Sequence, residues 1–276
     1  MKIKASRIVI TGAAAGIGAA LARCFSAAGA KQIIIVDRDA VAAKHVADEI
    51  AGLSVSLDVC DEVALKGLVD RIETEEGAID LFVSNAGTGK GDGEPWWATS
   101  ASNDDWNLLW QLHVMAHVYA ARACLPHFLA RKSGWFLNTA SAAGLLNQIG
   151  DAAYSTTKHA AIGFAESLAI THGDDGIGVS VLAPQAVATG LIGMADGQSD
   201  IAGVLTPEQV AESVLAGLEL GDFMILPHPE VKKFFAAKAD NYDRWVGGMR
   251  KLRRQSIALN PESGIRLPVS QLKESK

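Results

Sequence analysis

The sequence has few cysteines and no long apolar run, and both absences narrow what the protein can be. Its three cysteines, Cys24, Cys60 and Cys124, lie far apart and form no C-x-x-C pair. This excludes a disulfide framework and a cysteine-based zinc site, and it is typical of reduced thiols in a cytoplasmic protein. No stretch of eighteen or more apolar residues occurs, so we expect no membrane span. The first six residues also lack the apolar core of a signal peptide.

Acidic residues outnumber basic ones overall, but this balance reverses near the C-terminus. The formal net charge is −6, whereas residues 231–276 hold eleven Lys and Arg against four Asp and Glu. This extension therefore carries +7, which leaves −13 for residues 1–230. A basic tail can bind nucleic acid, but no nucleic-acid-binding motif precedes this one. We therefore expect a solvated or subunit-facing extension and no nucleic-acid partner.

Short apolar segments alternate with longer amphipathic ones along residues 7–226. Strands this uniformly apolar are covered on both faces, which predicts a parallel sheet. The alternation predicts an α/β, doubly wound (Rossmann) fold of about seven strands with helices on both faces. The expected strands are 7–10, 32–36, 54–57, 81–84, 134–138, 179–183 and 223–226, and the expected helices are 17–28, 40–51, 61–75, 103–131, 155–171 and 207–218.

We expect one dinucleotide-binding and catalytic domain over residues 1–230. Residues 231–276 then form an extension that is not a separate domain. Residues 231–254 have helical character, with an expected break at Gly247 and Gly248, and the last dozen residues show no regular pattern.

A glycine-rich turn joins the first expected strand to the first expected helix. Residues 11–18 read TGAAAGIG. Glycines at such a turn let a pyrophosphate approach the amides at a helix N-terminus, whose partial positive charge favours an anion. The turn alone could be structural, but its position between a strand and a helix favours a bound dinucleotide.

Asp37 follows the second expected strand and bears on the choice of dinucleotide. A carboxylate there can accept hydrogen bonds from the adenosine ribose hydroxyls and would repel a 2′-phosphate. The glycine turn contains no Arg or Lys to bind such a phosphate. NAD is therefore the expected cofactor and NADP the less favoured one, although the neighbouring Arg38 could accommodate the phosphate.

Tyr154 and Lys158 are four residues apart in an expected helix, so they project from the same face. A phenol has a pKa of about 10, and a fixed cation beside it lowers that pKa. Lowering it to about 7 takes roughly 4 kcal/mol. A well-placed lysine with a second positive charge can supply this. Ser141 lies thirteen residues before Tyr154, and its hydroxyl can orient a substrate oxygen.

Taken in order, these motifs resemble the classical short-chain dehydrogenase/reductase family over about residues 5–230. The pattern is T-G-x-x-x-G-I-G, an acidic residue after the second strand, Asn-Ala-Gly after the fourth, then a serine and Y-x-x-x-K. The resemblance implies hydride transfer with Tyr154 as acid/base, Lys158 lowering its pKa, and Ser141 holding the substrate oxygen. The cofactor contacts that it implies are Gly12, Ala15, Gly16, Ile17, Gly18, Asp37, Asp58, Val59, Asn85, Ala86, Gly87, Tyr154, Lys158, Pro184, Val187 and Thr189.

Two positions depart from the family pattern. His113 stands where the family has an asparagine that helps to hold a proton-relaying water beside the lysine. An imidazole can also bond a water and titrates near neutrality, so we expect either an altered relay through His113 or a histidine that fills a helix bend. Gln185 stands where the family has glycine in the loop that contacts the nicotinamide, which predicts a reshaped loop.

The resemblance also suggests the substrate and the partners. Residues 191–205 correspond to the family's substrate lid, and their apolar character favours an apolar or aromatic secondary alcohol or ketone as the small-molecule substrate. The alternatives are an NADPH-dependent carbonyl reductase and a non-catalytic dinucleotide-sensing protein. Family members pair through helices equivalent to 103–131 and 155–171, so a homodimer or homotetramer is expected.

Overall fold

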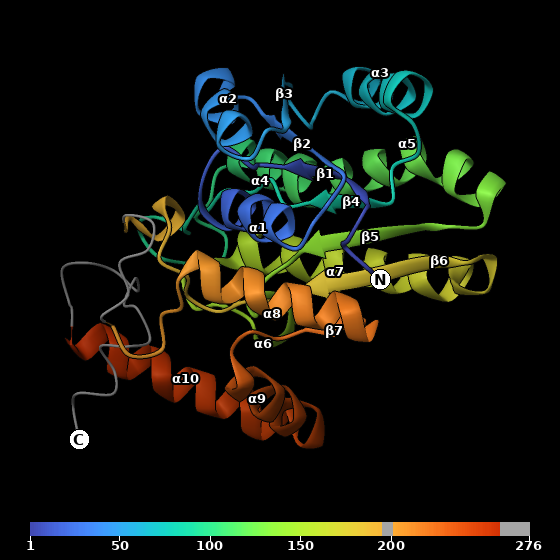
Figure 1. Cartoon of the computed structure of the whole chain (residues 1–276). Helices are drawn as coiled ribbons and strands as arrows, with labels where there is room; N and C mark the ends of the chain where they lie inside the picture. The colour runs from blue at the N-terminus through green and yellow to red at the C-terminus, as the bar shows by residue number, and fades with distance from the viewer. Residues whose placement is uncertain (195–200, 260–276) are drawn as a thin grey trace.

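The computed structural model describes residues 1–194 and 201–259. Seven parallel strands form one sheet in the order β3-β2-β1-β4-β5-β6-β7, which confirms the doubly wound fold (Figure 1). The strands are β1 Arg7–Thr11, β2 Gln32–Asp37, β3 Leu53–Ser56, β4 Leu81–Ser84, β5 Gly134–Thr139, β6 Ile177–Leu182 and β7 Met224–Ile225. Their carboxyl ends form the edge at which ligands bind in such folds.

Helices cover both faces of this sheet (Figure 1). On one face lie α1 and α8, and on the other lie α5 and α7. The helices of the domain are α1 Gly16–Ala27, α2 Ala40–Glu49, α3 Glu62–Arg71, α4 Asn103–Trp110, α5 Ala116–Arg131, α6 Ala143–Leu146, α7 Ala152–His172 and α8 Pro207–Leu220.

Side chains that alternate along the strands build two separate apolar cores. In β1, Val9 packs into the core beneath α3, α5 and α7, whereas Ile8 and Ile10 pack into the core beneath α1, α2 and α8. All three side chains are fully buried. The period of two that places neighbours on opposite faces of a strand produces this division.

Two expected helices differ from the structure by a π-helical turn. The expected helix 103–131 contains the π turn η2, Gln111–Met115, between α4 and α5. The expected helix 61–75 ends in a similar turn, η1, Ile72–Glu76. Such turns insert an extra residue into a helix and often occur at functional sites. The turn η2 places His113 in the interior of the protein.

The extension forms two helices, α9 Pro229–Asp240 and α10 Tyr242–Leu259. The predicted break at Gly247 and Gly248 is wrong because both glycines lie inside α10. The chain bends instead at Asn241, whose side chain accepts a hydrogen bond from the Arg244 amide at 2.8 Å and caps α10. The expectation for the last dozen residues lies outside the described part of the chain.

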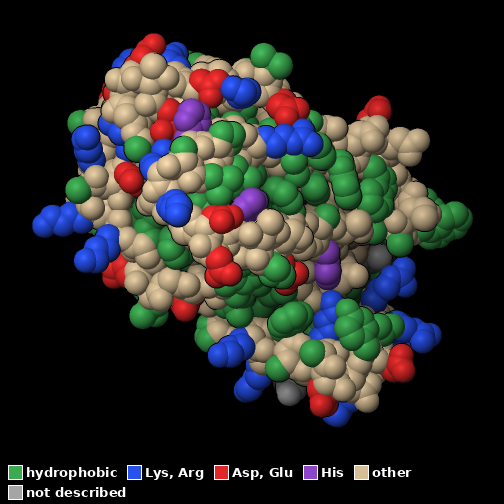
Figure 2. All heavy atoms as spheres, turned by 90° about the vertical axis from the view of Figure 1, so that its right-hand side faces the viewer, with side chains coloured by type: hydrophobic (Ala, Val, Ile, Leu, Met, Phe, Trp, Pro, Cys, Tyr) green, Lys and Arg blue, Asp and Glu red, His purple; other side chains and the backbone are tan. Residues whose placement is uncertain are grey.

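The extension packs against the domain through side chains of α9. Val231 is fully buried, and the buried Lys238 donates a hydrogen bond from Nζ to Leu145 O at 2.5 Å, at the end of α6. Lys and Arg side chains gather elsewhere on the lobe formed by α9 and α10, at the bottom of Figure 2. Within residues 1–194 and 201–259, none of the helices combines the length and apolar character needed to cross a bilayer.

Candidate active site

Three positions of the glycine turn between β1 and α1 have no room for a side chain. Gly12 has φ +62°, and a Cβ there would lie 2.6 Å from Ala86 Cα. Gly16 has φ +55°, with Thr189 Cγ2 at 3.1 Å from an added Cβ. At Gly18 an added Cβ would lie 2.3 Å from Gly12 O. Positive φ and close backbone approach leave a side-chain-free cradle at the N-terminus of α1, which fits the pyrophosphate of a dinucleotide. The flanking Ala15 and Ile17 belong to the same turn.

Asp37 braces this turn from the end of β2. Its Oδ2 accepts a hydrogen bond from Ala14 N at 3.1 Å, and its Oδ1 accepts one from Asp39 N at 3.1 Å. The carboxylate is therefore fixed beside the glycine turn, where it can also accept hydrogen bonds from ribose hydroxyls. Asp58 is exposed and accepts a hydrogen bond from Cys60 N at 2.9 Å, whereas the neighbouring Val59 is buried.

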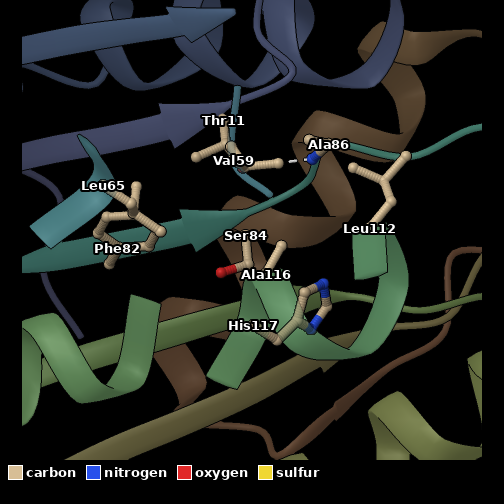
Figure 3. Close-up of a pocket in the computed structure, with 9 residues that line it drawn as sticks. All are labelled: Thr11, Val59, Leu65, Phe82, Ser84, Ala86, Leu112, Ala116 and His117. Atoms are coloured by element: carbon tan, nitrogen blue, oxygen red, sulfur yellow. Dashed lines mark hydrogen bonds between the residues drawn. The ribbon is translucent and has the colours of Figure 1, made fainter. Parts of the chain in front are cut away.

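Asn85 joins the ends of three strands. Its Nδ2 donates to Thr11 O and Gly12 O, both at 3.1 Å, and its Oδ1 accepts from Thr139 Oγ1 at 3.2 Å. Thr11 Oγ1 in turn accepts from the amides of Asn85 at 3.0 Å and Ala86 at 3.2 Å, the latter drawn in Figure 3. These bonds tie β1, β4 and β5 together beneath the glycine turn.

A narrow cavity behind Asn85 contains polar groups that sequence reasoning missed. It is lined by nine residues, among them Thr11, Ser84 and His117 (Figure 3). Within the described residues, Ser84 Oγ and both ring nitrogens of His117 have no hydrogen-bond partner. Burial, and then the charge of Lys158, lower the pKa of His117 to about 3. His117 is therefore neutral at pH 7, and only its burial, which the sequence does not reveal, distinguishes it from a surface histidine.

The structure brings Ser141, Tyr154 and Lys158 together at the carboxyl edge of the sheet. Tyr154 and Lys158 occupy the first two turns of α7, with Lys158 Nζ 5.6 Å from the centroid of the Tyr154 ring. Lys158 is buried, and its Nζ donates to Thr139 O at 3.1 Å. Ser141 follows β5, and its side chain hydrogen-bonds Tyr154. The Ser141 hydroxyl also accepts from Ala143 N at 3.1 Å.

Burial dominates the electrostatics of this group. It lowers the pKa of Lys158 to about 7. It also raises the pKa of Tyr154, while the hydrogen bond from Ser141 lowers it and the charge of Asp151 raises it further. The prediction that the protein side chains depress the Tyr154 pKa is therefore wrong. The physical reason is that removing a phenolate from water costs more free energy than the hydrogen bond from Ser141 recovers.

His113 supports Tyr154 instead of titrating. The buried ring accepts a hydrogen bond at Nε2 from Thr88 N at 3.2 Å, so its proton is on Nδ1, which donates to Thr157 Oγ1 at 3.0 Å. The ring meets Tyr154 edge-on at 5.4 Å between centroids. Burial, followed by the charges of Lys158 and His117, lowers the pKa of His113 far below its usual range. The expectation that His113 titrates near neutrality is therefore wrong.

The loop after β6 faces the glycine turn. Ala142 N donates to Pro184 O at 2.8 Å, which joins this loop to the Ser141 segment. Val187 is buried, and Thr189 Oγ1 donates to Val187 O at 3.3 Å. Gln185 N donates to Nδ1 of His228, a residue that sequence reasoning did not identify.

The expected lid follows this loop. Leu191 and Ile192 are about half exposed, Ile201 is exposed, and Val204 is buried. Gly89 adjoins the lid, since an added Cβ there would lie 3.5 Å from Leu191 Cδ1, whereas Gly87 adjoins His113, with an added Cβ 3.4 Å from its Nε2. Residues 195–200 of the expected lid lie outside the described chain.

Comparison with known proteins places this geometry in a family. A family model described as short chain dehydrogenase matches residues 6–198. Meso-2,3-butanediol dehydrogenase of Serratia marcescens is 34% identical over 191 residues, which are 67% of this chain and 72% of that protein. 1-Deoxy-11-beta-hydroxypentalenate dehydrogenase of Streptomyces exfoliatus is 34% identical over 197 residues, covering 70% of this chain and 71% of that protein.

A solved structure extends the likeness to almost the whole chain. The short chain dehydrogenase/reductase of Burkholderia phymatum, in complex with NAD, has 25% sequence identity and a TM-score of 0.76. It covers 97% of this chain and 100% of its own. Because a family match spans residues 6–198 and relatives share 34% identity over two thirds of the chain, the protein belongs to the short-chain dehydrogenase/reductase family of oxidoreductases.

Proposed function

We propose that this protein oxidises an apolar or aromatic secondary alcohol with NAD, or reduces the corresponding ketone. The observation that carries the proposal is the convergence of Ser141, Tyr154 and Lys158 beside a glycine cradle that excludes side chains. NAD, when bound, supplies the hydride chemistry. The residues of this chain then have to orient the substrate oxygen and manage one proton.

In this proposal Ser141 holds the substrate oxygen and Tyr154 exchanges its proton. The Ser141 hydroxyl already bonds the Tyr154 side chain, so a substrate oxygen placed between them lies within reach of both groups. Lys158 Nζ lies 5.6 Å from the centroid of the ring, so a protonated Lys158 would offset only part of the cost of burying the phenolate. His113 keeps the ring in place by its edge contact. Because burial raises the pKa of Tyr154, we expect alcohol oxidation to speed up as the pH rises.

Asp37 supports the choice of NAD over NADP. Its carboxylate is held at the end of β2 by two backbone amides, so a 2′-phosphate there would meet a fixed negative charge. The Burkholderia phymatum relative was solved with NAD, whereas an alcohol dehydrogenase from Thermococcus sibiricus was solved with 5-hydroxy-NADP. Titration of the protein with NADH and with NADPH tests this choice, and tighter binding of NADPH would favour a carbonyl reductase.

The lid supports an apolar substrate. Leu191 and Ile192 expose their side chains on the segment that follows Thr189, and Leu191 lies within van der Waals reach of Gly89. Burying such a surface against hydrocarbon or an aromatic ring lowers the free energy. The same surface offers no hydrogen-bonding or ionic partner to a strongly charged group.

The decisive variant is Tyr154→Phe, with Tyr119→Phe as the matched control. Tyr119 lies on α5, and its hydroxyl donates to Gln111 Oε1 at 3.2 Å. We expect Tyr154→Phe to keep NADH binding and lose nearly all turnover of secondary alcohols, followed by NADH absorbance, while the control remains active. Unchanged turnover of Tyr154→Phe would refute the mechanism. Tight NADH binding without turnover by the wild-type protein, across a broad alcohol panel, would favour a dinucleotide-sensing role.

We also propose that two copies of the chain pair through α5 and α7. A groove between these helices is lined by Val118, Ala121, Leu125, Phe164 and Leu168, together with polar residues at its rim. An apolar groove on paired helices matches the surface that a second copy would cover. Phe164→Glu should convert the assembly to a monomer in size-exclusion chromatography, and an unchanged elution volume would contradict this proposal.

A further inference from the structure

His228 links the extension to the loop that follows β6. It stands immediately before α9 and is 2% exposed. Its Nδ1 accepts a hydrogen bond from Gln185 N at 3.1 Å, because a backbone amide can only donate. The neutral ring therefore carries its proton on Nε2, which donates to Ala186 O at 3.1 Å. One imidazole thus holds the peptide groups 184–185 and 186–187 of the loop.

The same loop is held from a second side by the returning end of the lid. Leu205 N donates to Ala186 O at 3.1 Å, and Ala188 N donates to Leu205 O at 2.9 Å. The backbone of Gly203 also bonds the His228 ring. His228 therefore lies where the loop at 185–189, the end of the lid and the start of α9 meet.

This contact occurs at the position where the chain departs from the family pattern. Gln185 replaces the expected glycine, and its backbone amide donates the hydrogen bond that His228 Nδ1 accepts. Four residues after Gln185, the loop brings Thr189 to the glycine turn, where its Cγ2 limits the space above Gly16. A shift of the backbone at 185–186 would therefore move Thr189 relative to the cradle.

We propose that His228, the residue before α9, is a positioning residue for the loop at 185–189 and thereby sets dinucleotide affinity. The inference rests on the proposed function, since it takes this loop as one wall of the dinucleotide site. Burial lowers the pKa of His228, which agrees with the neutral ring that the two hydrogen bonds require. His228 then contributes to the site without touching the cofactor itself.

Three substitutions separate the two hydrogen bonds. His228→Phe keeps a planar ring and removes both bonds. His228→Asn places Oδ1 as many bonds from Cα as the histidine Nδ1, so it keeps the acceptor for Gln185 N. His228→Gln places an amide nitrogen at the position of Nε2, so it keeps the donor to Ala186 O. The control is His45→Phe, because the His45 side chain on α2 is 77% exposed.

Three measurements are made on the whole chain. Hydrogen exchange of the peptides that cover residues 184–189 reports the position of the loop without any cofactor. Titration calorimetry with NADH reports affinity, and thermal unfolding monitors the fold. We expect His228→Phe to speed exchange in this segment and to weaken NADH binding about five- to tenfold, while His228→Asn restores most of both. His45→Phe should change neither.

The outcomes distinguish the inference from the proposed function. If wild-type protein binds NADH and all three His228 variants match it in exchange and affinity, the positioning role is overturned while the proposed function stands. If His228→Asn and His228→Gln lose as much NADH affinity as His228→Phe, and all three lower the melting temperature to the same extent, His228 has only a structural role and the inference is overturned. If wild-type protein binds neither NADH nor NADPH, the proposed function fails, and the link to affinity fails with it.

Discussion

Replacing Lys158 with methionine should raise the free energy of unfolding while removing the proposed activity. Lys158 is buried, and burial lowers the pKa of its ammonium group from 10.5 to about 7. The folded state therefore holds this proton less tightly than the unfolded state, so the charged lysine destabilises the fold. Methionine is also long and unbranched but carries no charge, and it removes this penalty.

The size of the effect depends on pH because the penalty follows the proton. Below pH 7, Lys158 is protonated in both states, and the full penalty is about 5 kcal/mol at roughly 1.4 kcal/mol per pH unit. Above pH 7 the folded lysine is neutral, and the penalty falls to about 2 kcal/mol at pH 9 and vanishes near 10.5. Losing the hydrogen bond to Thr139 O costs about 1–2 kcal/mol. The variant should therefore gain about 3 kcal/mol at pH 6 and almost nothing at pH 9.

Urea unfolding at pH 6 and pH 9, followed by circular dichroism, measures this difference. The matched control is Lys66→Met, since Lys66 is exposed on α3 and pairs with Asp70. The control should change stability little, and by the same amount at both pH values. A gain for Lys158→Met that is equal at the two pH values, or a loss at pH 6, would refute the account of Lys158 as a destabilised buried cation.

Two further predictions concern the glycine turn and the start of α7. Gly12→Ala should lower the free energy of unfolding by about 2 kcal/mol or more and abolish NADH binding in calorimetry, because its Cβ would lie 2.6 Å from Ala86 Cα. The control Gly247→Ala, in open space on α10, should stabilise the protein by up to about 1 kcal/mol in urea unfolding. The buried Asp92 accepts from Ala152 N at 2.8 Å, so Asp92→Ala should lower stability by about 1 kcal/mol and reduce turnover, while Asp92→Asn retains most of both. Equal urea midpoints for the two Asp92 variants would contradict this cap.

The sheet could be predicted because its strands carry their own signal. A strand such as β1 has three consecutive apolar residues at its centre, Ile8, Val9 and Ile10, and this pattern requires cover on both faces. The glycine turn and the four-residue spacing of Tyr154 and Lys158 could also be predicted, because each depends only on residues that are close together in the sequence. The turn η2 was not, because a π turn changes the hydrogen-bond register of a helix without a distinct composition.

The parts of the site that sequence did not reveal depend on burial and on distant contacts. His228 meets Gln185 across 43 positions of the chain. The direction of the Tyr154 pKa follows from desolvation, which only the packed structure determines. The bend at Asn241 is different, because Asn is a preferred helix cap and it directly precedes the residues that form α10, which is a usable signal in the sequence.

The division of the apolar interior between the two faces of the sheet has a consequence for engineering. Val9 and Ile10 are neighbours in sequence, yet they pack into different cores. Substitutions at these two positions should therefore add in free energy, because they share no packing partners. Val9 and Phe82 lie in the same core on paired strands and should couple. The half that carries α1 and α8 and the half that carries α5 and α7 could accordingly be optimised in separate libraries and then recombined.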